Sequence, residues 1–245
     1  MRAIVTYHSI DGSGSAISID VETFERQLEA LIERGIPVLP LERLATVPPG
    51  GSAVALTFDD ALVSFAERAW PALRRRGLPV TVFAPVDRLG SDNAWGGRAE
   101  AGIPRVEVLD GEALRRLVGE GLAVGSHGVT HCDLRELPAE ALERELEESR
   151  DRLEALTGVR PRAIAYPYGG VDRRVAAAAR RHYELGVTTV LRPLRAGEDA
   201  LLLPRLDAWY LRGPGWPDAW GTRRMRTYLA ARRTLRAARR ALQFR

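Results

Sequence analysis

Val54–Ala61 reads VALTFDDA, and this stretch decides the predicted fold. Its first five residues are apolar or β-branched, as in a strand that is buried on both faces, and two aspartates follow directly. A helical pattern through Ala66–Arg76 ends at Gly77, and a second apolar run occupies Val80–Pro85. A strand, a helix and a strand in this order form the unit of a parallel sheet.

The same alternation extends over most of the chain in both directions. The predicted strands are Ala3–Tyr7, Val54–Phe58, Val80–Pro85, Leu122–Ser126, Ala163–Tyr166, Val187–Leu191 and Leu201–Leu206. The predicted helices are Thr23–Arg34, Ala66–Arg76, Asp110 to about Val118, Pro138 to Gly158, and Val171–His182. The pattern predicts a single α/β domain, built either as a barrel or as a doubly wound sheet.

The composition is typical of an ordinary globular protein. The 245 residues are 45% hydrophobic and 28% charged, which excludes a largely disordered chain. One cysteine, Cys132, excludes an intramolecular disulfide, and no apolar run approaches the roughly 18 residues of a membrane-spanning helix. The opening MRAIVTYHSI is too short for the apolar region of a signal peptide, so we expect a cytoplasmic protein.

The excess of positive charge lies entirely at the C-terminal end. Nine arginines and no acidic residue occupy positions 223–245. Apolar residues recur there every three or four positions, at Met225, Tyr228, Ala231, Leu235, Ala238 and Leu242. This predicts a basic amphipathic helix in 217–245, either packed on the domain or bound to an anionic membrane surface, at the inner face of the membrane, or to an acidic partner. Nucleic acid is not expected, because no nucleic-acid-binding motif accompanies the charge.

Side chains that can bind metal or transfer protons follow four of the predicted strands. They are Tyr7 and His8, Asp59 and Asp60, Ser126–His131, and Tyr166–Gly169. Because active sites of α/β folds lie at the carboxyl ends of the strands, we expect these groups to meet at one rim. The fourth histidine of the chain, His182, is predicted to be exposed at the end of an arginine-rich helix.

Two histidines and a carboxylate are a ligand set that leaves positions open for catalysis. His127 and His131 are four residues apart, and one helical turn would place both imidazoles on the same side. Asp59 and Asp60 are adjacent, so in an extended chain only one of them points toward a given ion. Taken singly, the aspartates could instead cap a helix. Gly128 replaces the glutamate of the H-E-x-x-H pattern, which argues against a zincin-type protease.

Three segments together resemble a known family. LTFDDA (Leu56–Ala61), SHGVTH (Ser126–His131) and AYPYGG (Ala165–Gly170) are similar to the first three motifs of the polysaccharide deacetylases, the NodB-homology domain of carbohydrate esterase family 4. The resemblance covers roughly residues 3–209. It implies a single-domain distorted (β/α)7 barrel over residues 1–216, followed by the basic C-terminal helix, and a divalent metal, usually zinc.

The resemblance also implies a role for each matching residue. Asp60, His127 and His131 would be the metal ligands. Asp59 would be the general base, and the backbone N–H of Tyr168 would help to hold the oxyanion.

The chain departs from the usual family pattern at three places, one of which is that the usual Asp-x-x-Trp motif is present only as Asp207-Ala208-Trp209. No histidine follows His182 to act as general acid, but VTYHSI (Val5–Ile10) resembles the permuted branch of the family, in which an N-terminal histidine, here His8, has this role. Ala165 stands where the motif has an arginine that orients the base, and Arg205 is our hypothetical substitute.

The activity implied by the resemblance is that of a metal-dependent carbohydrate N-deacetylase, a hydrolase of non-peptide C–N amide bonds. Its substrate would be N-acetylhexosamine units of a polysaccharide, an oligosaccharide or a glycan precursor. Trp95, Tyr168 and Trp209 could stack on sugar rings or belong to the core. Two alternatives stay open: a sibling amidase that acts on a small cyclic amide or a formamide, and a non-catalytic glycan-binding barrel.

Overall fold

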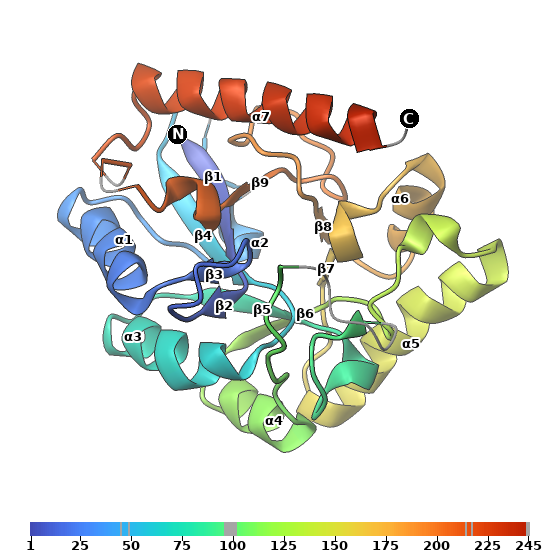
Figure 1. Ribbon diagram of the computed structural model, residues 1–245. Coiled ribbons are helices and arrows are strands. Elements are labelled where there is room, and N and C mark those ends of the chain that lie inside the picture. The colour runs from blue at the N-terminus through green and yellow to red at the C-terminus, as the bar shows by residue number, and fades with distance from the viewer. Residues whose placement is uncertain (45, 49, 96–101, 214, 217, 244–245) are drawn as a thin grey trace.

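Seven parallel strands form a nearly closed barrel in the computed structural model, with helices around it (Figure 1). The structure describes residues 1–44, 46–48, 50–95, 102–213, 215–216 and 218–243, with side chains in the last helix as far as residue 235. The strands are β1 (Arg2–Tyr7), β4 (Ala53–Phe58), β5 (Val80–Ala84), β6 (Ala123–Ser126), β7 (Ala163–Ala165), β8 (Leu185–Val187) and β9 (Arg205–Asp207).

Their order in the sheet is β8-β7-β6-β5-β4-β1-β9. A parallel bridge between Val187 and Leu203 links the β8 edge to the segment that leads into β9. The predicted (β/α)7 barrel is therefore confirmed, and the doubly wound alternative is excluded.

Seven α-helices are present among the described residues. They are α1 (Val21–Glu33), α2 (Leu41–Leu44), α3 (Trp70–Arg75), α4 (Gly111–Gly119), α5 (Ala139–Thr157), α6 (Arg173–Ala179) and α7 (Arg223–Gln243). A π-helical turn (Phe65–Ala69) leads into α3, and β2 (Ser9–Ile10) pairs with β3 (Ser18–Ile19) in a separate two-stranded sheet. Short 3₁₀ turns occupy Val86–Arg88, Leu134–Glu136, Pro167–Gly169 and Ala208–Leu211.

Aspartates begin three of these helices. The side chains of Asp20, Asp110 and Asp172 each accept a hydrogen bond from the backbone N–H three residues further on, at 2.7–2.8 Å. Such a cap typically stabilises a helix by about 1 kcal/mol. At the other end of α5, Gly158 adopts a φ of 73°, which glycine allows without steric conflict.

The core beneath the rim of the barrel is aromatic. Tyr7 stacks on Phe58 at a ring distance of 5.0 Å, and Phe24 meets Tyr7 edge-on at 5.2 Å. The backbone N–H of Asp59 donates to the carbonyl of Tyr7, which continues the pairing of β1 with β4 by one residue. Because the ends of β1 and β4 are fixed in this way, the residues that follow them start from defined positions.

Two predicted strands are misplaced along the sequence. The strand predicted at Val187–Leu191 lies at Leu185–Val187, and the one predicted at Leu201–Leu206 begins only at Arg205. At Gly186 a Cβ would lie 2.5 Å from the Tyr166 hydroxyl and 2.6 Å from a backbone oxygen, so the strand needs glycine there. The β-branched run at 188–190 lies outside the strand, although its composition favours one. The helix predicted at Val171–His182 is shorter as well, at Arg173–Ala179.

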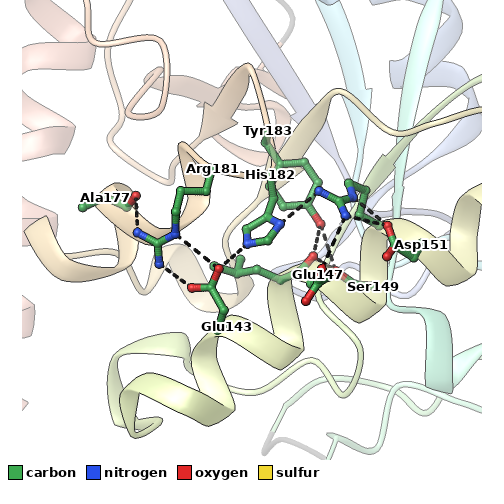
Figure 2. A network of polar contacts seen from close by, with 10 residues as sticks. Glu143, Glu147, Ser149, Asp151, Ala177, Arg181, His182 and Tyr183 are labelled. Carbon is green, nitrogen blue, oxygen red and sulfur yellow. Dashed lines mark hydrogen bonds and ion pairs between the residues drawn. The ribbon is translucent and has the colours of Figure 1, made fainter.

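The prediction that His182 is exposed is wrong. Its side chain is only 8% exposed and lies between α5 and the end of α6 (Figure 2). Nε2 is 2.6 Å from a carboxylate oxygen of Glu143, and Nδ1 is 3.0 Å from a guanidinium nitrogen of Arg150. Because a guanidinium only donates, Nδ1 accepts and the Nε2–H donates to Glu143. His182 thus ties the two helices together.

The first half of α7 packs on the barrel, as one of the two alternatives predicted. Met225 and Leu229 are buried in the main core. The ring of Tyr228 stacks on Trp216 at 3.9 Å, and its hydroxyl donates to the carbonyl of Tyr210 at 2.8 Å. This packing gives no support to a membrane contact through Met225 and Tyr228, because both face the protein.

The remainder of the predicted basic helix is only partly described. Leu235 is 54% exposed, while the side chains of Ala238 and Leu242, and the boundary at residue 217, lie outside the described residues. Among the residues that are described, no helix has both the length and the apolar character needed to cross a bilayer.

Candidate active site

A cavity of about 140 Å³ opens at the carboxyl ends of the strands. It is lined by His8, Ile17, Asp59, Asp60, Asn93, Trp95, Ile103, His127, His131, Tyr166, Tyr168 and Thr189. The structure thus brings together seven of the nine residues singled out from the sequence. Of the other two, Arg205 lies behind Asp59, and Trp209 does not line this cavity.

Asp60, His127 and His131 form a group that could hold a metal ion. One ligand atom from each lies within 4.8 Å of the others, and all three residues are buried. Oδ1 of Asp60 is 3.4 Å from Nε2 of His127 and 3.2 Å from Nε2 of His131.

These distances fit a tetrahedral cation. Ligand bonds of 2.0–2.2 Å at a tetrahedral centre place neighbouring ligand atoms about 3.3–3.6 Å apart. Oδ1 of Asp60 is buried and accepts no hydrogen bond from the described residues. A buried carboxylate oxygen without a donor is costly in an apolar setting, and a cation in contact with it removes that penalty.

The two imidazoles are oriented by different neighbours. Nδ1 of His127 donates to the carbonyl oxygen of Ala165 at 2.7 Å, which leaves the Nε2 lone pair directed toward Asp60. The ring of His131 lies between two aromatic side chains, stacked on Trp95 at 4.1 Å and edge-on to Tyr168 at 4.8 Å. Stacking fixes the plane of His131 in place of a hydrogen bond, since its Nδ1 has no partner among the described residues.

The segment between the histidines is a loop and not the helical turn considered from the spacing. Gly128 has a φ of 78° and His131 a φ of 62°, so the chain turns sharply after β6. One oxygen of Glu145, on α5, accepts hydrogen bonds from the N–H of Val129 and from the N–H and hydroxyl of Thr130, at 2.7–3.0 Å. The four-residue spacing identified His127 and His131 as a pair, but hydrogen bonds to Glu145 hold the loop between them.

Left-handed backbone is concentrated at this site. Among the described non-glycine residues, positive φ occurs at Asp60, Ala61, His131 and Tyr168. Each such residue typically stores strain of order 1–3 kcal/mol. Asp60 and His131 are metal-ligand candidates, and Tyr168 lines the cavity. The contacts that position these side chains therefore outweigh the preference of the backbone for negative φ.

Asp59 faces away from the imidazole pair and toward Arg205. The guanidinium of Arg205 donates to both carboxylate oxygens, each at 2.7 Å, and its Nε donates to the carbonyl of Thr188. A further N–H donates to the hydroxyl of Thr6 at 2.9 Å. Both partners are almost fully buried, at 3% and 2% exposed. Arg205, from β9, therefore holds Asp59 in a fixed orientation, the task hypothesised for it from the sequence.

Burial and neighbouring charge act against each other on the site's titrating groups. Burial would raise the pKa of Asp59, but the Arg205 guanidinium outweighs it and keeps that pKa below the ordinary value. Burial acts in the same direction on Asp60, whereas His127 and His131 hold its pKa well below the usual range. Burial lowers the pKa of His131, whereas at His127 burial is outweighed by the Asp60 and Asp59 carboxylates, which raise its pKa above the ordinary value.

His8 lines the cavity next to Asp59. Its Nε2 is 3.7 Å from Oδ2 of Asp59, and its side chain is 25% exposed. It follows β1 directly and is the one histidine of the cavity that solvent reaches to this extent. An imidazole and a carboxylate therefore flank the same small space.

The aromatic candidates differ in where they lie. Trp95 and Tyr168 line the cavity, and Tyr168 is 48% exposed. Trp209 packs against the main core, with the guanidinium of Arg212 at 4.0 Å from its ring.

Several lining residues and Glu145 were not singled out from the sequence. Ile17, Asn93, Ile103 and Thr189 come from loops whose paths no periodicity reveals. Glu145 did leave a signal: it is a carboxylate one residue before Leu146, on the apolar side of α5.

Comparison with known proteins agrees with this combination of barrel and site. A profile of the polysaccharide deacetylase family matches residues 46–189. The Bacillus subtilis (strain 168) protein YxkH is 24% identical over 192 residues, which are 76% of this chain and 63% of YxkH. The peptidoglycan-N-acetylmuramic acid deacetylase PdaC of the same organism is 29% identical over 136 residues, 55% of this chain and 25% of PdaC. The chain thus spans less than two thirds of these relatives.

Solved structures share the fold. BC0361, a polysaccharide deacetylase from Bacillus cereus, superposes with a TM-score of 0.69 at 26% identity, over 84% of this chain and 64% of that one. IcaB from Ammonifex degensii gives a TM-score of 0.72 at 23% identity, over 89% and 97% of the two chains.

The chain thus has a parallel α/β barrel with a buried Asp-His-His group at the carboxyl ends of its strands. The chain belongs to the polysaccharide deacetylase family.

Proposed function

We propose that the protein is a metal-dependent N-deacetylase that hydrolyses the acetamido group of N-acetylhexosamine units in a glycan or glycan precursor. The observation that carries this proposal is the pair of adjacent aspartates with separate surroundings. Asp60 faces two imidazole nitrogens at 3.2–3.4 Å, whereas Asp59 is held by Arg205 and faces His8. The carboxylate of Asp60 is thereby available to bind a cation, and that of Asp59 is available to accept a proton.

Asp60, His127 and His131 would hold the cation, and zinc suits two imidazoles and one carboxylate. When bound, such a cation lowers the pKa of a water ligand to about 7 and polarises a carbonyl oxygen. Family membership and the spacing of the three ligand atoms support this assignment.

The chain's own groups would move the protons. Asp59 takes a proton from the water that attacks the acetyl carbon, and Arg205 keeps its carboxylate oriented throughout. The N–H of Tyr168 stabilises the oxyanion that forms on the former carbonyl oxygen. His8 donates a proton to the amine nitrogen as the C–N bond breaks, so that acetate and a free amino sugar leave.

The cavity suits a small acyl group better than a long buried ligand. At about 140 Å³ it has room for an acetamido group and part of one sugar ring. Trp95 and Tyr168 offer aromatic faces at its wall for that ring. A cytoplasmic glycan precursor as the substrate remains a prediction from the sequence.

Acetate release tests the proposal. The protein is incubated with N-acetylglucosamine oligomers before and after removal of metal by a chelator, and metal content is measured in parallel. We expect acetate from the loaded protein, loss of release on chelation and recovery with zinc. Asp59→Asn should retain the metal but lower the rate by a factor of about 10²–10⁴, the usual contribution of general base catalysis. A loaded protein that binds the oligomers and releases no acetate would favour the non-catalytic glycan-binding barrel.

A further inference from the structure

A second cavity, larger than the first, lies at the opposite end of the barrel. Its volume is about 460 Å³, and it is enclosed by α7, by the amino ends of β1 and β4, and by the segment that follows β8. Figure 1 shows α7 running beside the start of β1. The lining includes Arg2, Arg192, Arg195, Arg226 and Arg233, and no aspartate or glutamate among the described residues.

Most of this positive charge is not neutralised. Arg192 is paired with Glu198 at 2.5 and 2.9 Å. Arg2 instead donates to two neutral acceptors, the carbonyls of Val47 and Arg195, at 2.8 and 2.9 Å. Among the described residues no carboxylate forms an ion pair with Arg2, Arg195, Arg226 or Arg233.

Some exposed arginines elsewhere on the molecule form ion pairs, whereas others, such as Arg115 and Arg223, form none with a described carboxylate. Arg162 pairs with Glu184, Arg180 with Asp199 at 2.9 Å, and Arg144 with Glu140 at 2.7 Å. What distinguishes the unpaired arginines described above is therefore their position, because several of them line one cavity.

The geometry of α7 directs two of the charges into the cavity. Arg226 and Arg233 are seven residues apart, so they lie on one face of the helix about 10 Å apart along its axis. Leu229, which is buried, and Ala230 fill the wall between them. Arg2, fixed by its two carbonyl acceptors, and Arg195 line the cavity from the barrel side.

We propose that this cavity binds a phosphate-bearing anion. A guanidinium presents planar N–H donors that match phosphate oxygens, and several of them around one space favour phosphate over a single carboxylate. The ligand is distinct from the hydrolysed glycan group, because the two cavities lie at opposite ends of the strands. A soluble phosphate compound and a phospholipid headgroup present the same chemistry to these arginines.

Phosphorus NMR of inorganic phosphate titrated with the full-length protein tests the proposal. We expect the phosphate signal to shift and broaden with the wild type. The variant Arg226→Gln/Arg233→Gln should bind at least about tenfold more weakly, because two charge-assisted contacts are lost. The matched control is Arg115→Gln/Arg223→Gln, which removes the same charge from exposed positions that do not line the cavity.

Co-sedimentation with vesicles of phosphatidylcholine and phosphatidic acid separates the two sources. Vesicle binding that inorganic phosphate displaces supports a headgroup in the cavity, and phosphate binding without vesicle binding supports a soluble ligand. Absence of phosphate binding by the wild type would overturn the proposal. Equal weakening of phosphate binding in both double variants would overturn it as well. Binding that neither double variant weakens would also overturn it, because that is the result expected if phosphate is held at the Asp-His-His group.

Discussion

At the carboxyl end of the barrel, Asp59 and Arg205 are 3% and 2% exposed and form a two-point ion pair. At the amino end, Arg226 and Arg233 line an open cavity in which the described residues include no carboxylate. The same seven strands support both ends. The difference follows from solvation, since a charge removed from water needs a partner and a charge at a wet surface does not. The buried end can therefore fix geometry for chemistry, while the open end keeps charge available for a ligand.

The largest expected effect concerns the ligand group of the buried end. His127→Ala removes one of three ligand atoms that lie within 4.8 Å of one another. We expect loss of bound zinc in elemental analysis and a fall in acetate release of about 10³-fold or more, because the cation both activates water and polarises the carbonyl. Arg226→Gln, at the other end, should leave both quantities unchanged, and a parallel loss there would break the contrast between the two ends.

The next effect is on stability. Arg205→Met leaves the buried carboxylate of Asp59 without its counter-charge, and such losses typically destabilise a protein by about 3–5 kcal/mol. The control is Arg192→Met, which breaks a more exposed pair with Glu198 and should cost about 1 kcal/mol or less. Urea unfolding measures both, and equal changes would show that burial does not distinguish the two pairs.

Glu145 offers a test of how the His127–His131 loop is held. Its carboxylate accepts three hydrogen bonds from Val129 and Thr130, so Glu145→Ala should weaken metal binding by about 10–100-fold, as the loss of outer supports usually does. Glu145→Gln keeps an acceptor oxygen and should restore most of the affinity. Competition with a metal-binding dye gives the values, with the exposed Glu148→Ala as control; an unchanged affinity in Glu145→Ala would remove Glu145 from the account.

The smallest effect is expected at the α5–α6 contact of Figure 2. Hydrogen bonds from Arg181, and then from His182, lower the pKa of Glu143 to about 2. A lowered folded-state pKa stabilises the protein above the ordinary glutamate pKa, and this contribution is lost as the pH falls toward about 2. Glu143→Gln should therefore reduce stability by up to about 1 kcal/mol near neutral pH, and by less near pH 3. Urea unfolding midpoints of the wild type and the variant at the two pH values test this prediction. A difference in stability that does not change with pH would contradict the lowered pKa assigned to Glu143.

The sequence predicted the elements whose signals are local. Apolar runs located most strands to within one or two residues, and the cap at Asp110 located the start of α4. The strand at Leu185–Val187 was misplaced because its position depends on the close approach of Gly186 to Tyr166, which no local pattern records. His182 was misjudged for the same reason, since its partners Glu143 and Arg150 are more than thirty residues away.

The site was predictable in its residues and not in its geometry. Family motifs supplied Asp60, His127 and His131, and the missing motif arginine directed attention to Arg205. The left-handed backbone at Asp60, His131 and Tyr168 could not be foreseen, because non-glycine residues adopt it only where tertiary contacts impose it.

The most direct measurement is anomalous X-ray scattering from crystals grown with zinc, recorded on both sides of the zinc absorption edge. The account predicts one strong peak about 2.1 Å from a carboxylate oxygen of Asp60 and from Nε2 of His127 and His131, with Asp59 beyond bonding distance. A peak bonded to Asp59, or no peak between the two imidazoles in crystals of active protein, would contradict it.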